Sequence, residues 1–322
     1  MYNICELILA VAILSTYNFP ITSNPRQIAH VIKDLTRTRE SDAILLGPPG
    51  SPLSLVSSVQ VAERDLLHEL YIWRNYSSAS YKPKDQKWNC PVCLTWPLDS
   101  TDYSIVLANP TETCVVMLAL NVKLHTLVMS FRGTDNKEGA IADLRANLIQ
   151  WPPEIPESRV HRGFYDSYMS IRPELLTALK LYMAKCTWCD LTVTGHSLGG
   201  AQATLAALDA VLTFKSMKNK VLLYTFASPR PGNPAFARAI LRHQIPVYRV
   251  VKEGDVVPML PPQGVIYSHV GHTVWIKNDN TTLLCLTSER VLENPSCSSK
   301  WRFQVKLDML RKTHSCFWGL CM

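Results

Sequence analysis

The segment 191–201, Leu-Thr-Val-Thr-Gly-His-Ser-Leu-Gly-Gly-Ala, most constrains how this chain can fold. A β-type apolar run enters the segment, and an alanine-rich helical pattern leaves it. Gly195 and Gly199 flank Ser197, and glycine at these places lets a strand turn sharply into a helix. The pattern predicts a nucleophile elbow, with the Ser197 hydroxyl exposed near a helix N-terminus and the His196 side chain directed away from it. A glycine-rich turn without chemistry is the plainer alternative.

Strand and helix patterns alternate along the rest of the chain. Apolar β-type runs cover residues 103–107, 114–120, 126–131, 221–226 and 247–251. Helical repeats of apolar residues cover 171–183 and 234–243. This alternation predicts an α/β fold with a mostly parallel central sheet covered by helices, and ligands at the carboxyl ends of the strands. Together with the elbow, it predicts a single catalytic domain of the α/β-hydrolase type over residues 59–322.

The first 58 residues differ from the rest. Residues 7–14 form an apolar run of signal-peptide length that is too short to span a bilayer, so residues 1–23 are predicted to be a signal peptide. Because Glu6 precedes this run and no Lys or Arg does, an uncleaved signal that anchors the protein in a membrane is the alternative. Residues 24–58, with glycine and proline gathered at 47–52, are predicted to be a linker or pro-segment.

The cysteines point to the same compartment as the N-terminal run. Ten cysteines in 322 residues are many for a cytosolic enzyme and indicate an oxidising environment. We therefore expect a secreted, extracellular protein. Asn75 and Asn280 each begin an Asn-x-Ser/Thr acceptor and are the predicted glycosylation sites.

A catalytic serine needs a histidine to take its proton and an acid to orient that histidine. In the α/β-hydrolase order, the acid and then the histidine follow the serine. The strand pattern at 247–251 runs into a loop that places Asp255 at a carboxyl end, so Asp255 is the predicted acid. Glu253, two residues nearer the strand, is the alternative.

The histidine is less constrained, because three histidines follow Asp255. His269 and His272 precede another strand-like segment, where a histidine is more often structural. His314 follows a helical pattern at 305–311 and lies in a terminal loop. The residues favour His314 and leave the other two open.

Six segments resemble the fungal-type class 3 lipase family, which includes secreted triacylglycerol lipases and feruloyl esterases. The resemblance covers roughly residues 60–322, with the segments in register along the chain. They are VMSFRGT at 128–134, VHRGF at 160–164, GHSLGG at 195–200, SPRPGN at 228–233, DVVPMLPP at 255–262 and HVGHTVW at 269–275.

The resemblance implies roles for several residues. His314 falls on the family's catalytic histidine, whereas His269 falls on a position that the family uses structurally. The Thr134 backbone N–H and hydroxyl, with the Leu198 backbone N–H, would form the oxyanion hole. Val257 would line the acyl groove.

The family also has disulfide bonds where this chain has two of its cysteine pairs. The resemblance implies the bonds Cys90–Cys93 and Cys285–Cys297. It leaves open the pairing of Cys114, Cys186, Cys189, Cys316 and Cys321.

The resemblance further implies a helical lid directly after Thr134, which a lipid surface draws open. Within residues 135–144 only Ile141 and Leu144 are large and apolar, so these are the predicted substrate-facing residues of the lid. At about 1.5 to 3 kcal/mol for each fully buried side chain, opening the lid in water would cost about 3 to 6 kcal/mol at most. We expect shallow interfacial activation, with appreciable activity on dissolved short-chain esters. The measurement is the rate against ester concentration through the solubility limit, and a jump of about a hundredfold or more would contradict the expectation.

These observations together predict a secreted serine carboxylester hydrolase that acts on acylglycerols at a lipid–water interface. A triacylglycerol lipase that works through an acyl-enzyme is the first choice, with phospholipase A1 or feruloyl esterase specificity as alternatives. A catalytically silent lipid-binding protein is the alternative outside enzymes. The two Cys-x-x-Cys pairs lie too far apart for a zinc ribbon, so no metal or cofactor is predicted, and no obligate protein partner is evident. A net charge of +7 without a basic run interleaved with aromatics argues against a nucleic-acid partner.

Overall fold

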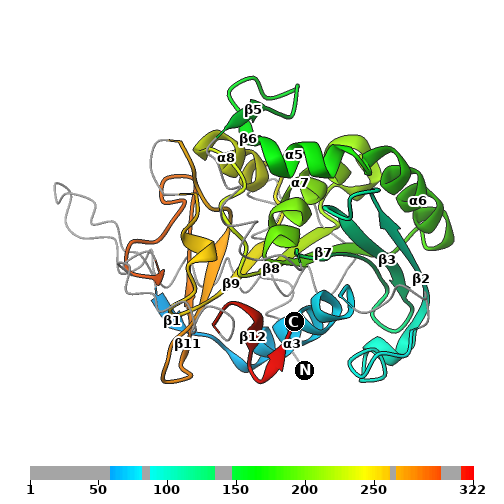
Figure 1. Ribbon diagram of the computed structural model, residues 1–322, viewed down its shortest axis with the longest axis horizontal. Helices are drawn as coiled ribbons and strands as arrows, with labels where there is room; N and C mark the ends of the chain where they lie inside the picture. Colours follow the sequence, from blue (N-terminus) through cyan, green and yellow to red (C-terminus); the bar gives the residue numbers. More distant parts are fainter. Residues whose placement is uncertain (1–58, 82–87, 135–146, 262–265, 299–312) are drawn as a thin grey trace, which may run out of the picture. The chain divides into compact units, whose positions relative to one another are not determined.

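The computed structural model describes residues 59–81, 88–134, 147–261, 266–298 and 313–322 (Figure 1). Residues 59–322 form a compact unit of their own. The expected signal peptide (1–23), the linker (24–58) and the lid segment with Ile141 and Leu144 fall outside the described residues. Among the helices of the described ranges, none is both long enough and apolar enough to cross a bilayer.

A nine-stranded sheet is the framework of the domain, in the order β1-β11-β10-β9-β8-β7-β4-β3-β2. The five central strands run parallel, and they are β10 (His272–Ile276), β9 (Val247–Lys252), β8 (Val221–Phe226), β7 (Asp190–His196) and β4 (Thr126–Phe131). The strands at the two edges pair antiparallel, and they are β11 (Thr282–Cys285), β1 (Val59–Val61), β3 (Val115–Asn121) and β2 (Thr101–Ala108). The parallel centre and its covering helices confirm the predicted α/β-hydrolase class.

Each face of the sheet has its own hydrophobic core. In β3, Val116 and Leu118 belong to one core and Met117 and Ala119 to the other, because successive side chains of a strand point to opposite faces. Figure 1 shows α5 to α8 along one side of the sheet and α3 (Arg64–Ala79) with β12 (Cys316–Phe317) along the other. The four helices are α5 (Arg162–Met169), α6 (Arg172–Lys185), α7 (Leu198–Thr213) and α8 (Pro234–Arg242). Both faces are covered, so β4 and β7 are buried along their whole length.

Helix α7, which follows the elbow, is buried from Gly199 to Val211. It packs on β7, β8 and β4 with one side and on α5 with another, and its many small residues allow this close approach. Asp209 is a charged residue within this buried stretch, and it accepts hydrogen bonds from the Tyr168 hydroxyl at 2.6 Å and the Arg172 guanidinium at 2.7 and 2.8 Å. The helix behind the serine is therefore held between the sheet and α5, with further bonds from Tyr168 and Arg172.

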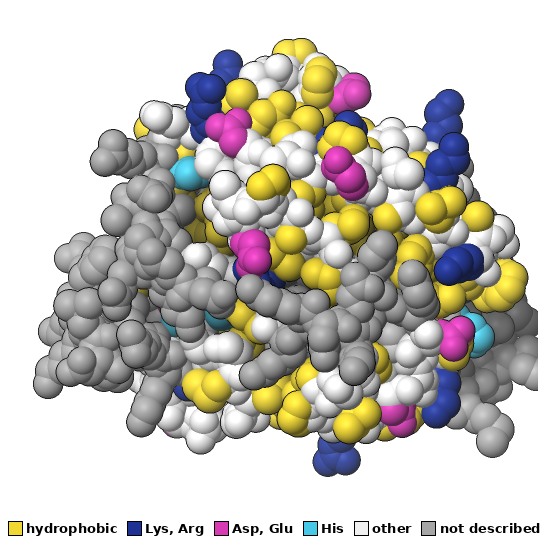
Figure 2. Space-filling model, turned by 45° about the vertical axis from the view of Figure 1, so that its right-hand side comes forward, with side chains coloured by type: hydrophobic (Ala, Val, Ile, Leu, Met, Phe, Trp, Pro, Cys, Tyr) yellow, Lys and Arg dark blue, Asp and Glu magenta, His cyan; other side chains and the backbone are white. Residues whose placement is uncertain are grey.

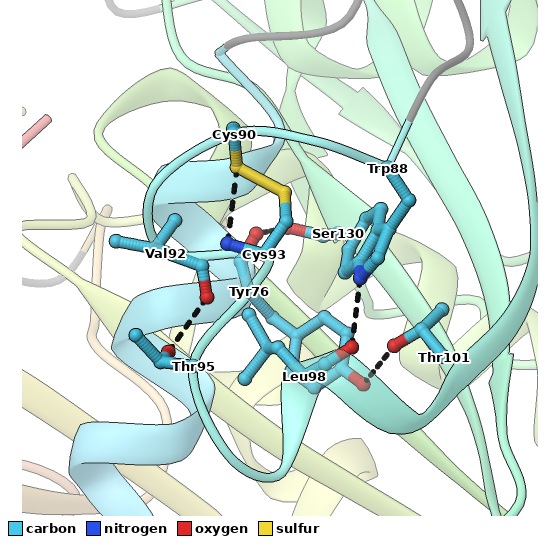
Figure 3. Close-up of a disulfide and its surroundings, with 9 residues drawn as sticks. All are labelled: Tyr76, Trp88, Cys90, Val92, Cys93, Thr95, Leu98, Thr101 and Ser130. Carbon is cyan, nitrogen blue, oxygen red and sulfur yellow. Dashed lines mark hydrogen bonds between the residues drawn. A yellow bond between two sulfur atoms is a disulfide. The ribbon is translucent and has the colours of Figure 1, made fainter.

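Four disulfide bonds occur within the described residues, and they are Cys90–Cys93, Cys186–Cys189, Cys285–Cys297 and Cys316–Cys321. The last closes the hairpin of β12 and β13 (Leu320–Cys321) at the C-terminus. Figure 3 shows the Cys90–Cys93 turn, where the Trp88 indole donates to the Leu98 carbonyl at 2.7 Å and the Thr95 hydroxyl to the Val92 carbonyl at 2.7 Å. These bonds fix residues 88–98, which lead into β2.

Cys114 is a free thiol buried in the core between the sheet and α7. Burial raises the pKa of this thiol to about 12, so it stays protonated at neutral pH. A buried thiol of this kind behaves as a small apolar side chain.

The surface carries charges of both signs. On the face shown in Figure 2, the described acidic and basic side chains are spread among hydrophobic and neutral ones. Of the two predicted glycosylation sites, Asn280 is exposed in the turn between β10 and β11. Asn75 is half-buried within α3, and the Ser77 of its acceptor triplet is fully buried. Asn280 is therefore the more accessible acceptor.

Candidate active site

The elbow lies between β7 and α7, with Ser197 at φ 57° and ψ −129°. A non-glycine residue in this region is strained by roughly 1 to 3 kcal/mol, and such strain persists only where the surroundings enforce it. The Ser197 N–H donates to the Phe226 carbonyl of β8 at 2.8 Å. A Cβ on Gly199 would strike the Phe131 carbonyl, and a Cβ on Gly195 would strike the Gly199 carbonyl. Both glycines are therefore needed for the chain to turn in this space.

Three side chains meet at the elbow. The His314 Nε2 lies 2.8 Å from the Ser197 Oγ, and the His314 Nδ1 lies 3.1 and 3.0 Å from the two carboxylate oxygens of Asp255. All three are buried, with exposed fractions of 6% for Ser197, 3% for His314 and 5% for Asp255. The carboxylate only accepts, so the His314 Nδ1–H donates to it and Nε2 is left to take the hydroxyl proton. A buried serine, histidine and acid in this order of contact can carry out nucleophilic attack on an acyl group.

Asp255 is fixed by its own loop. Its backbone N–H donates to the Lys252 carbonyl at the end of β9 at 3.1 Å, and its Oδ1 accepts from the Val257 N–H at 3.0 Å. Short side chains that bond to the backbone two residues on stabilise such turns. Val257, expected in the acyl groove, is buried, and its described hydrogen bond holds the acid in place.

The other candidates from the sequence lie elsewhere. Glu253 accepts from the Asn278 N–H at 2.7 Å, beyond the end of β9. His272 bonds to the Thr287 hydroxyl at 3.2 Å, and the His269 Nε2–H donates to the Pro258 carbonyl at 2.6 Å. The structure brings only His314 of the three late histidines to Ser197.

The expected oxyanion groups lie beside the elbow. Gly133 is so close to it that an added Cβ would lie 3.1 Å from the Ser197 Cβ, and Thr134 is the next residue. Leu198 is the first residue of α7, where backbone N–H groups have no acceptor within the helix. The loop after β4 and the start of α7 therefore present donors at the same end of the sheet as Ser197.

A buried cluster that sequence analysis missed supports the loop after Asp255. Arg230 and Glu293 form an ion pair with two bonds, at 2.8 and 2.9 Å, and both side chains are about 5% exposed. The Arg230 guanidinium also donates to the Met259 and Pro261 carbonyls at 2.6 and 2.9 Å, and its backbone N–H donates to the Leu260 carbonyl at 2.8 Å. With the bond from His269 to Pro258, four successive carbonyls of this loop are held.

The charges of this cluster follow from its burial. Burial, followed by the nearby charges of Arg249 and Arg230, lowers the pKa of His269 well below its ordinary value, so this histidine is neutral. Burial alone would raise the pKa of Glu293, but the hydrogen bonds and charge of Arg230 outweigh it and hold the pKa below its ordinary value. Burial also lowers the pKa of Arg249 to about 10, although Glu293 opposes the shift. The cluster therefore contains a neutral histidine beside ionised arginine and glutamate.

The pKa of His269 predicts a pH dependence of stability. Below the ordinary value of 6.5, the unfolded chain binds a proton at His269 that the folded chain does not, so stability falls as pH falls. At about 1.4 kcal/mol per pH unit, the free energy of unfolding should fall by at most about 2 kcal/mol between pH 7 and pH 5 through this residue. His269→Gln keeps a donor for the Pro258 carbonyl and does not titrate. Urea unfolding at both pH values should show a larger fall in the free energy of unfolding for the wild type than for the variant. An equal fall in the two proteins would contradict the assignment.

Comparison with known proteins gives the family. A family model described as "Lipase (class 3)" matches residues 128–265. A lipase of Rhizomucor miehei is 32% identical over 256 residues, which are 77% of this chain and 68% of that protein. A lipase of Rhizopus niveus is 33% identical over 66% of this chain, and there the match spans only about half of the relative, 54%.

Solved structures agree with the sequence comparison. The structure of a triacylglycerol lipase with a serine protease triad as its catalytic centre superposes with a TM-score of 0.75 at 30% identity, over 82% of this chain and 98% of that one. The residues that carried the resemblance, the fold and these matches lead to one conclusion. The chain belongs to the class 3 lipase family.

Proposed function

We propose that this protein is a serine carboxylester hydrolase that cleaves acylglycerols at a lipid–water interface, as a triacylglycerol lipase does. One observation carries the proposal: the buried contact of Ser197 with His314, and of His314 with Asp255, at hydrogen-bond distances. The related proteins named lipases, and the solved triacylglycerol lipase with a serine protease triad, support the substrate class.

On this geometry we assign each of these residues a role in the proposed reaction. The Ser197 Oγ attacks the ester carbonyl while the His314 Nε2 takes its proton, and His314 then returns that proton to the leaving alcohol. The product of this half is an acyl-enzyme, which water cleaves by the same route with His314 again as the base. Asp255 keeps the His314 ring in the tautomer that can accept the proton and stabilises its charged form.

The oxyanion would be held by the Thr134 and Leu198 groups. The negative charge that develops on the carbonyl oxygen needs donors that are already in place, and each such donor contributes about two to three decades in rate. The α7 N-terminus adds a partial positive charge at the same position. Val257 beside the acid is proposed to line the acyl groove, and Ile141 and Leu144 in the lid segment to face the substrate.

The protein's destination is part of the same proposal. Relatives include proteins named secreted mono- and diacylglycerol lipases. We infer secretion after removal of a signal peptide at 1–23, with 24–58 as a linker or pro-segment and a glycan on Asn280. An uncleaved N-terminal signal would leave the protein membrane-anchored, and mass analysis of the secreted chain separates the two outcomes.

A fluorophosphonate probe together with a substrate panel tests the proposed function. The probe should label the wild type at Ser197, and Ser197→Ala should abolish the labelling. Triacylglycerol, lecithin and feruloyl esters should then be assayed with the wild type and the variant, and triacylglycerol should be hydrolysed fastest. Faster cleavage of lecithin or of feruloyl esters would replace the substrate class, and absence of both labelling and turnover would leave a lipid-binding protein.

A further inference from the structure

A second histidine lies directly behind the catalytic one. The His196 side chain is fully buried, and its ring centroid lies 4.8 Å from that of His314 and 6.1 Å from that of Phe317. Its Nε2 lies 2.9 Å from the His314 carbonyl oxygen, and its Nδ1 lies 2.6 Å from the Tyr81 hydroxyl. Both ring nitrogens are therefore engaged away from the Ser197 hydroxyl.

The directions of these hydrogen bonds are fixed by the groups at the two ends. The His314 carbonyl can only accept, so the His196 Nε2 carries the proton and Nδ1 of the neutral ring accepts. The Tyr81 hydroxyl must then donate to Nδ1, which leaves its oxygen to accept from the Gly133 backbone N–H at 3.0 Å. The result is one chain of bonds that runs from Gly133 through Tyr81 and His196 to His314, which we name the Tyr81–His196 relay.

The relay joins the three segments that carry the proposed chemistry. Gly133 precedes the oxyanion residue Thr134, His196 precedes the nucleophile, and the accepting carbonyl belongs to the catalytic histidine itself. Gly133 is required for the approach, because an added Cβ would collide with the Tyr81 hydroxyl and would lie 2.7 Å from the His196 carbonyl oxygen. These bonds tie the oxyanion loop to the His314 backbone through the elbow.

We propose that Tyr81 and His196 are positioning residues, which hold the oxyanion loop and the backbone of His314 in register with Ser197. The inference rests on the proposed function, since it assigns these residues to the same site. The described hydrogen bonds of both side chains run to each other, to the Gly133 N–H and to the His314 carbonyl, so their role is to position these groups and not to react. A small displacement of His314 or of the oxyanion loop changes the reacting geometry, and a misplacement of about 1 Å can cost about a hundredfold in rate.

The test compares variants that remove one bond with variants that keep it. Tyr81→Phe removes only the hydroxyl, and His196→Leu removes both ring nitrogens. His196→Gln offers an amide that can donate to the His314 carbonyl and accept from Tyr81. Tyr71→Phe is the matched control, because Tyr71 lies on α3, which ends two residues before Tyr81, and packs edge-on against Trp318, outside the relay.

On a soluble ester, Tyr81→Phe and His196→Leu should lower kcat about 10- to 100-fold with KM within about twofold. His196→Gln should recover at least part of the loss, and Tyr71→Phe should stay within about twofold of the wild type. The rate of fluorophosphonate labelling at Ser197 should fall in parallel with kcat, with the thermal midpoint of Tyr81→Phe near that of the wild type.

The possible results separate the relay from the proposed function. If the wild type labels and turns over while Tyr81→Phe and His196→Leu keep its kcat, the relay proposal is wrong and the function stands. A higher KM with unchanged kcat would also overturn the positioning role. If the wild type neither labels nor hydrolyses esters, the proposed function fails before the relay is examined.

Discussion

Replacing His314 with alanine is expected to lower kcat about a million-fold on a soluble ester. The imidazole is the group within 2.8 Å of the Ser197 hydroxyl, and without it the serine has no base to take its proton. In a catalytic triad, removal of the base lowers kcat about as much as removal of all three residues, because the three act as a unit. Steady-state kinetics on a dissolved ester gives kcat, with enzyme concentration raised to follow the slow variant.

Two further variants make this result specific. His272→Ala tests the neighbouring candidate, which bonds to Thr287 on the far side of β9 and should leave kcat within about twofold. The double variant Ser197→Ala/His314→Ala should lose little more than either single change. An His314→Ala enzyme that kept more than about a hundredth of the wild-type kcat would mean that another group serves as the base.

The parts of the fold that could be predicted are those that local sequence determines. The apolar runs at 126–131, 221–226 and 247–251 match β4, β8 and β9 to within about one residue. A buried strand can be predicted in this way because the apolar character of its own residues indicates it. The elbow was also predictable, since the glycines that allow it lie within two residues of the serine.

The contacts that complete the site could not be read in this way. Ser197 and His314 are separated by 117 positions and Asp255 and His314 by 59, and nothing local to His314 states which strand end it meets. Position after the acid left three histidines open. The local pattern favoured His314, and the family resemblance was needed to set the other two aside. The structure shows why the other two do not serve as the base: His269 donates a hydrogen bond to the Pro258 carbonyl, and His272 bonds to the Thr287 hydroxyl.

The supporting residues were missed for a similar reason. Arg230 and Glu293 lie 63 positions apart and Tyr81 and His196 lie 115 apart, and each residue alone is ordinary for a polar surface. A buried charge must have a partner, but burial is known only once the fold is known. The disulfide Cys316–Cys321 was left open because the sequence did not assign partners to five of the cysteines. In the structure, the C-terminal hairpin places Cys316 and Cys321 opposite each other.

Replacing Asp255 with asparagine is expected to lower kcat about ten-thousandfold with little change in fold. The size follows from the tautomer of His314. The Val257 N–H needs an acceptor at Oδ1, so an asparagine would keep its carbonyl oxygen there and turn its amide NH2 toward the His314 Nδ1 at the place of Oδ2. An NH2 group donates, so Nδ1 would become the acceptor and the proton would move to Nε2, which then cannot take the proton of Ser197.

The measurement is kcat on a dissolved ester beside the free energy of unfolding in urea. The matched control is Glu253→Gln, two residues earlier, whose carboxylate accepts from the Asn278 N–H and should matter little to kcat. Labelling by a fluorophosphonate should slow with kcat, because it too needs His314 to take the proton of Ser197 during the attack. If Asp255→Asn kept more than about a tenth of the wild-type kcat, the His314 ring would have to be oriented by something other than this carboxylate, and Glu253→Gln would show whether that residue had taken its place.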